Sequence, residues 1–77
     1  MTYCVGELIK LGHRVHHTTM QVGNLRQAMG KTVDILPDDL MIVLGGFILA
    51  EEYQYLFVMS ANHNEIGFVS ARVIELA

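Results

Sequence analysis

The sequence is poor in several residue types, and each shortage excludes a class of protein. Only one of its 77 residues is cysteine, so no disulfide can form within the chain and we expect a reducing compartment, the cytoplasm. Lys and Arg number five and the net charge is −3, whereas binding to nucleic acid needs clustered cations. Residues 1–4 have no basic stretch followed by an apolar one, so we expect no signal peptide.

Long apolar runs are also missing. The longest, residues 40–50 with its two glycines, is shorter than the roughly 20 residues of a membrane-spanning helix. We therefore expect no membrane contact and one soluble domain, residues 1–77. Such a small domain builds only a small core, yet 52% of its residues are apolar. The surplus indicates exposed apolar surface and self-association, unless the strands of the core are simply rich in Val, Ile and Leu.

Short β-branched and aromatic runs follow one another in the second half, and turn residues end each of them. This pattern predicts strands at residues 32–36, 40–44, 53–59, 65–69 and 73–76. The fold class is mainly β, and we expect a small barrel of five to six strands.

The first half is less regular. Residues 3–11 are typical of a strand interrupted at Gly6, and residues 14–22 alternate between polar and apolar as a second strand does. Residues 24–29 fit either a short helix that Gly30 ends or a long irregular hairpin loop. We therefore expect an extended loop or a short helix in this half.

The segment that closes the second half, residues 67–74, reads GFVSARVI. It is similar to the Gly-(Tyr/Phe)-(Ile/Val)-Pro-Ser-Asn-Tyr-Val of Src-homology-3 domains, and residues 34–76 as a whole resemble the second half of that family. Tyr55 and Leu56 fall where the family keeps two tryptophans. The resemblance implies a Src-homology-3-like barrel, in which aromatic side chains form a groove for proline-rich peptides.

Most of the groove residues of that family are replaced. The chain has no Trp, Ser70 stands for the Pro of the closing segment and Val73 for its Tyr. The family's first-loop motif, Ala-Leu-Tyr-Asp-Tyr, is not found in residues 1–33. A polyproline groove depends on stacked aromatic faces, and only Tyr55 could supply a comparable ring.

Histidines form the one local cluster of potential metal ligands: His13, His16 and His17. On a strand, His13 and His17 would share a face, but a zinc site needs one or two further ligands. Cys4, Glu7 and His63 are the candidates. Exposed loop histidines are the alternative, and we expect neither a metal nor a cofactor.

One strand has two apolar faces. On one side lie Tyr53, Tyr55 and Phe57, and on the other Leu56 and Val58. Such a strand needs two surfaces to pack on, and a barrel interior supplies only one. The second is a partner subunit, unless residues 12–30 fold over the outer side.

These observations favour a non-catalytic protein-interaction or assembly subunit that forms a homo-oligomer. Aromatic rings dominate interface energetics, so the contact candidates are Tyr53, Tyr55, Phe57 and Phe68. The chain contains no catalytic motif. Two alternatives remain open: a divergent proline-rich peptide-binding module, and an oligomeric enzyme or ligand-binding protein. The latter would have a pocket between copies, formed by His16, His17, Tyr55 and Arg72.

Titration of the protein with proline-rich peptides tests the implied groove. We expect no binding, because the stacked aromatic faces that recognise a polyproline helix are missing from the sequence. Saturable binding would show that Tyr55 and other residues rebuild the groove.

Overall fold

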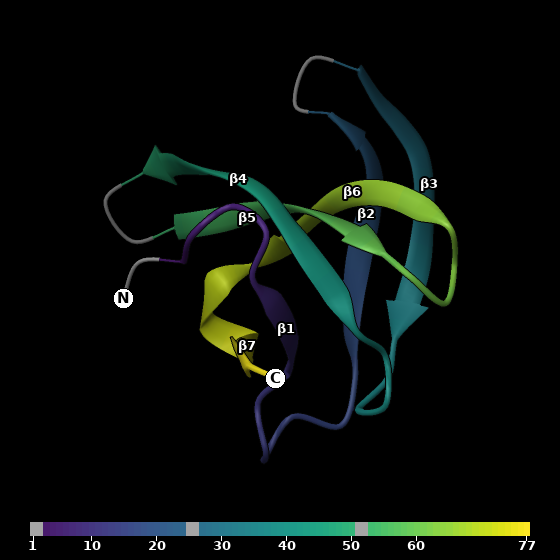
Figure 1. Cartoon of the computed structure of the whole chain (residues 1–77). Helices are drawn as coiled ribbons and strands as arrows, with labels where there is room; N and C mark the ends of the chain where they lie inside the picture. The colour runs from purple at the N-terminus through teal and green to yellow at the C-terminus, as the bar shows by residue number, and fades with distance from the viewer. Residues whose placement is uncertain (1–2, 25–26, 51–52) are drawn as a thin grey trace.

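The described part of the chain forms seven strands, all paired antiparallel in one sheet in the computed structural model (Figure 1). The structure describes residues 3–24, 27–50 and 53–77, and their side chains apart from those of residues 24, 27–29, 46–50 and 53. The strands are β1 (Leu8–Leu11), β2 (Thr18–Asn24), β3 (Gln27–Ile35), β4 (Met41–Ala50), β5 (Tyr53–Ser60), β6 (Glu65–Ser70) and β7 (Ile74–Leu76). A short 3-10 helix, η1 (Ala71–Val73), joins β6 to β7.

The second half follows the sequence pattern closely. Its expected strands all form, and the turn at residues 61–64 contains Asn64 with a positive φ of 52°, a conformation that Asn tolerates. The mainly β class is confirmed. The expected five to six strands of the barrel are too few, because both segments expected as strands in the first half and all five of the second half join one seven-stranded sheet.

The short helix or long irregular hairpin loop expected at residues 24–29 is wrong for residues 24 and 27–29, and residues 25–26 lie outside the described part of the chain. Asn24 ends β2 and Gln27 begins β3, so these residues pair with each other in an antiparallel hairpin. A helix of about one and a half turns cannot persist alone, whereas extended backbone obtains ladder hydrogen bonds from its neighbour. The expected second strand also starts later than residue 14, because β2 begins at Thr18.

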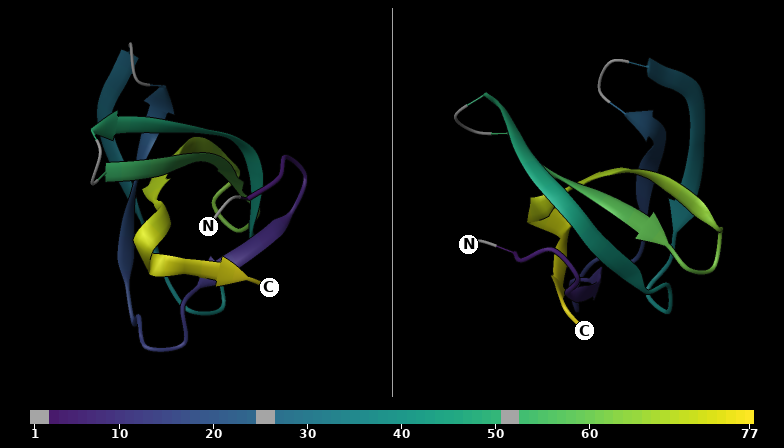
Figure 2. Two further views of the ribbon diagram at one scale, coloured as in Figure 1. Left: turned by 90° about the vertical axis from the view of Figure 1, so that its left-hand side faces the viewer. Right: turned by 45° about the horizontal axis from the view of Figure 1, so that its top comes forward.

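The strand order is β3-β2-β6-β5-β4-β1-β7. β1 pairs with β7 on one side and β4 on the other, so the two ends of the chain lie together at one side of the sheet. The turned views show how strongly the sheet curls around its interior (Figure 2). No pairing joins β3 to β7 within the described residues, so the ladder is not closed there.

The core lies on the inner side of this curl and draws on every strand. Its members share low exposure and alternate along their strands, as the period of two requires. They are Ile9, Leu11, Met20, Val22, Ile35, Met41, Val43, Leu56, Val58, Val69 and Ile74. The half-buried Tyr3, Val15, Val33, Ala71 and Val73 pack against them.

The first-half hairpin reaches this core through a close backbone crossing. β2 meets β6 in only two register pairs, Gln21 with Phe68 and Val22 with Gly67. A Cβ on Gly67 would overlap the carbonyl oxygen of Gln21 and lie 3.1 Å from Cγ of Met20. Only glycine permits this approach, because backbone atoms occupy the space of a side chain.

Gly67→Ala therefore tests the crossing. We expect a loss of about 1–3 kcal/mol or more in the free energy of unfolding, because the Ala methyl forces β2 away from β6. Chemical denaturation measures the loss.

Gly45→Ala is the matched control. Gly45 also lies inside a strand, but a Cβ there meets nothing within 4 Å. We expect stability to change little or to rise by a few tenths of a kcal/mol, because Ala has less unfolded-state freedom. Equal effects of the two substitutions would contradict a special role for the crossing.

Candidate functional site

β5 separates the core from a second apolar surface. Leu56 and Val58 are 3% and 0% exposed and belong to the core. Tyr55, Phe57 and Met59 alternate with them, lie on the other side of the strand and are only half-buried. The side chain of the fourth residue of this series, Tyr53, lies outside the described residues.

Four apolar residues form a row across this outer side. Leu8 stands opposite Ile42, Ile42 opposite Met59, and Met59 opposite Ile66. Directly opposite residues in an antiparallel ladder share a face and touch, so the row runs across β1, β4, β5 and β6. We call these four residues the outer row, and the outer row with Tyr55 and Phe57 the outer face.

The neighbouring row shows that the outer row does not face the core. Ile9 stands opposite Met41, and Met41 opposite Ser60. All three are 0% exposed. In the outer row, by contrast, Leu8 is 49% and Ile66 44% exposed. A shift of one residue along β1, β4 or β5 therefore leads from a fully buried side chain to a partly exposed one.

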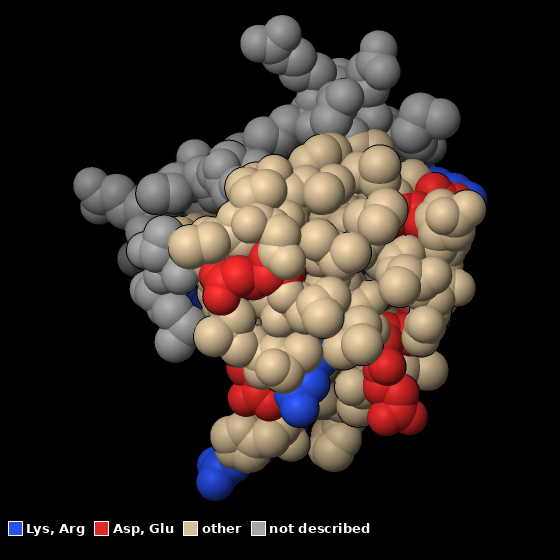
Figure 3. Space-filling view, viewed as in Figure 1, with Lys and Arg blue, Asp and Glu red and all other residues tan. Residues whose placement is uncertain are grey.

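The outer row carries no charge. Its members are Leu, Ile, Met and Ile. On the face of the molecule seen in Figure 3, a broad area without Lys, Arg, Asp or Glu lies between charged groups at the left, the right and the lower end. An exposed, contiguous apolar surface with a polar surround is typical of protein–protein contact sites.

Phe68 lies on the same side of the sheet as Phe57 and packs beside the outer face. It stands opposite Phe57 and is 8% exposed, so it offers little contact area itself. Its ring meets that of Tyr55 edge to face, with centroids 5.9 Å apart and planes at 89°. This T-shaped geometry is one that aromatic pairs prefer, and it fixes the ring of Tyr55 on the surface.

The hairpin of the first half does not cover the outer row at its crossing. Gly67 stands opposite Val58, which faces the core, and the side chain of Met20 lies against Gly67 on that same side. β2 therefore packs over the inner side of β6.

The candidate metal ligands are not brought together. His13, His16 and His17 precede β2 instead of lying on a strand. Nδ1 of His13 lies 3.9 Å from Glu75, and Nε2 of His17 lies 3.0 Å from Asp34. The described residues contain no group of three His, Cys, Asp or Glu placed to bind a metal ion. Of the residues considered for a pocket between copies, His16 is an exposed loop residue and Arg72 an exposed residue of η1.

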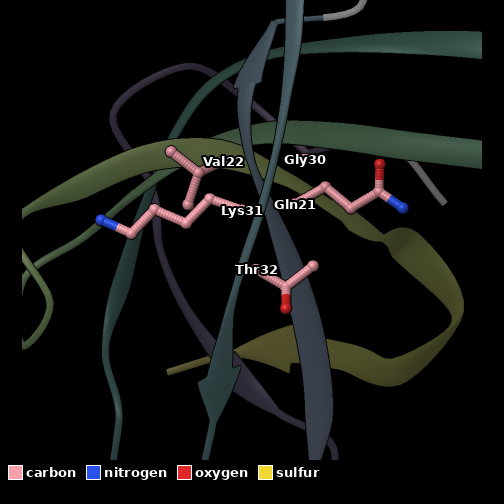
Figure 4. Close-up of a pocket in the computed structure, with 5 residues that line it drawn as sticks. All are labelled: Gln21, Val22, Gly30, Lys31 and Thr32. Carbon is pink, nitrogen blue, oxygen red and sulfur yellow. The ribbon is translucent and has the colours of Figure 1, made fainter.

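A small pocket lies along the first-half hairpin (Figure 4). Its volume is about 170 Å³, below the roughly 300–1,000 Å³ of typical small-molecule sites. It is lined by Gln21, Val22, Gly30, Lys31 and Thr32. Its size and its single charged side chain do not favour a cofactor.

A buried polar cluster fixes one end of the sheet. Asp39, 7% exposed, accepts a hydrogen bond from the Leu36 amide at 2.8 Å and another from the side chain of Asn62. Nε2 of His63 lies 3.5 Å from its carboxylate. Asp39 thus ties the turn between β3 and β4 to the loop between β5 and β6.

The same cluster contains a serine and a histidine, but not a catalytic triad. Ser60 is 0% exposed, and its hydroxyl accepts a hydrogen bond from the main-chain amide of His63 at 3.4 Å. A serine nucleophile needs the imidazole as its base and access to substrate, and Ser60 has neither. The cluster is structural.

Sequence reasoning found the face of β5 but missed most of the outer row. Leu8, Ile42 and Ile66 lie in three other strands, and only the ladder register places them beside Met59. Strong alternation in each strand was the available signal, but register is not readable from alternation alone.

Comparisons with known proteins identify no relative of this chain. The chain matches no protein-family model, no curated protein and no solved structure. None of the helical segments in the described residues is long and apolar enough to cross a lipid bilayer.

Replacement of Asp39 tests the polar cluster. Burial on its own raises the pKa of Asp39. The hydrogen bonds from Leu36 and Asn62 and the neighbouring His63 together lower it by more than that, so the pKa of Asp39 lies below the ordinary 3.8. At about pH 7 we expect Asp39→Asn to lower the free energy of unfolding by about 1–3 kcal/mol.

The pH dependence of unfolding tests whether the negative charge of Asp39 stabilises the cluster. A lowered pKa contributes stability above the ordinary value of 3.8, and this contribution is lost as pH falls through the folded-state pKa below it. The difference between wild type and Asp39→Asn should therefore shrink in denaturation at about pH 3. The exposed Asp38 provides the control Asp38→Asn, for which we expect little change. A pH-independent difference for Asp39→Asn would contradict the charge-based account.

Proposed function

We propose that the chain is a Src-homology-3-like barrel that acts as a non-catalytic assembly subunit and associates with further copies through its outer face. The observation that carries the proposal is the uncharged row Leu8–Ile42–Met59–Ile66, which continues across four strands and is half-exposed at both ends. A two-fold axis through such a face would use each residue twice.

The barrel part of the proposal is supported by the arrangement of the last elements. The GFV segment begins at Gly67, a 3-10 helix follows β6, and the final strand pairs with β1, which in turn pairs with β4. Within the described residues β3 and β7 do not pair, so the barrel that we propose is a curled sheet that stays open between these two strands.

The energetics indicate how much of the face has to take part. Full burial of a Leu or Ile side chain contributes about 1.5–3 kcal/mol, so residues that are already half-buried contribute roughly half of that. Association costs an estimated 4–15 kcal/mol in lost freedom. Counted on two copies, the four residues of the outer row give roughly 6–12 kcal/mol. This sum lies within the cost of association, so the burial of Tyr55 and Phe57 is needed to leave a clear surplus.

Ile66→Lys tests the face. A charge placed at the half-exposed end of the outer row would be buried without a partner on association, which is strongly unfavourable. In light scattering across a concentration series, we expect the wild type to be oligomeric and Ile66→Lys to have the mass of one chain.

Leu76→Lys is the matched control. Leu76 is 53% exposed, also lies in a strand and gives the same change in charge. It stands opposite the buried Ile9, so it belongs to the other face. We expect this variant to associate like the wild type, with circular dichroism confirming that both variants fold. A wild type that is monomeric throughout, or an Ile66→Lys variant that associates normally, would refute the proposed role of the face.

A further inference from the structure

β3 is an open edge of the sheet. It occupies one end of the strand order, and within the described residues it pairs only with β2 (Figure 1). It has nine residues, whereas β7 at the other end has three. An end strand presents backbone N–H and C=O groups that can pair with a further strand.

The charged side chains of β3 that could protect this edge are paired with other residues of the same chain. Nζ of Lys31 lies 2.6 Å from a carboxylate oxygen of Glu65 in β6. Oδ1 of Asp34 lies 3.0 Å from Nε2 of His17. Figure 4 shows the Lys31 side chain leaving the hairpin on the same side as the buried Val22. β3 also contains no proline, the other common protection of an edge.

The regular part of this edge is short and well defined. Gly30 has a positive φ of 69°, and the β2–β3 register shifts between Gln21 and Gly23. Residues 31–35 follow as one extended run with Val33 at the centre. A partner strand can therefore form an uninterrupted ladder of backbone hydrogen bonds only with residues 31–35.

We propose that β3 pairs antiparallel with β3 of a second copy, in a register centred on Val33. A two-fold axis perpendicular to the sheet keeps each face on one side, so the register must be centred on a residue. A centre at Lys31 or Asp34 places like charges opposite each other, which is destabilising. A centre at Thr32 brings in Gly30 and its positive φ.

The Val33 register matches side chains of suitable chemistry. Val33 meets Val33 of the partner subunit on the side that packs toward the core, where β-branched pairs are favourable. Thr32 stands opposite Asp34 of the partner subunit on the other side, and both residues are exposed. The Thr32 hydroxyl donates to the carboxylate oxygen that does not bond His17. The seven-stranded sheets of two copies become one continuous sheet.

This contact is separate from the outer face. It uses backbone hydrogen bonds of β3, and it requires none of the outer-row residues. The two surfaces together would allow each copy to contact two others.

Cysteine cross-linking tests the register. Thr32→Cys and Asp34→Cys are made separately in a Cys4→Ser background. In the proposed register Cα atoms of residues 32 and 34 of the two copies are about 4.5–5.5 Å apart, within disulfide reach. Each residue is roughly 8 Å from its own counterpart, which is beyond that reach.

We therefore expect an equimolar mixture of the two proteins to form disulfide dimers about tenfold faster than either protein alone. The same comparison in the Ile66→Lys background separates the edge from the outer face: a faster mixture there supports edge pairing even if the face does not associate. Equal rates for the mixture and the single proteins in both backgrounds overturn the proposal.

Hydrogen–deuterium exchange tests the contact in the unmodified chain. Amides of residues 31–35 that point away from β2 exchange fast in a monomer, and edge pairing slows them as protein concentration rises. We expect this protection to increase with concentration, while amides of the exposed loop at residues 61–64 show no such increase. Protection of residues 31–35 that is independent of concentration overturns edge pairing.

Discussion

The backbone crossing at Gly67 is the constraint on which the arrangement depends. β2 and β6 share only two register pairs, and a side chain at Gly67 would occupy the position of the Gln21 carbonyl. Because Gly67 has no side chain, the first-half hairpin can turn its apolar side inward and bring Met20 and Val22 onto the same core as β4, β5 and β6. Without the crossing, the other five strands would have an apolar inner side and no hairpin to cover it. The hydrophobic stabilisation that Met20 and Val22 add to the core therefore depends on the absence of a side chain at Gly67.

The interior is already filled without the apolar residues on the outer side of β5. Leu56 and Val58 satisfy the packing needs of β5 on one side, so the aromatic residues on its other side are not required to complete the core. Tyr55 is nevertheless fixed by its edge-to-face contact with Phe68, which gives the surface a rigid aromatic element rather than a mobile one. Rigid aromatic groups lose little conformational entropy on contact, and this favours their use in association. The first-half hairpin adds a different kind of surface, in which backbone rather than side chains would form the contact.

Sequence patterns could predict part of this structure. The strands from Met41 onward, their turns and the two apolar faces of β5 follow from alternation and turn chemistry, which act over a few residues. The first-half hairpin could not be predicted, because Asn24 is as compatible with a helix cap as with a strand, and only its pairing with Gln27 decides. The outer row and the Asp39–Asn62 hydrogen bond join segments far apart in sequence, so their signals are absent from any local window.

The pairing of the first and last strands bears on how the fold is reached in time. β7 pairs with β1, and the hydroxyl of Tyr3 donates to the carbonyl of Ile74 at 3.1 Å, although the two residues are 71 positions apart in the chain. Contacts between such distant segments form late, because a long loop must be ordered before they contribute. A ribosome releasing this chain would have made β1 well before its partner existed. The edge of β1 that faces β7 would therefore stay unpaired until residues 74–76 have emerged, and only then could the sheet be completed.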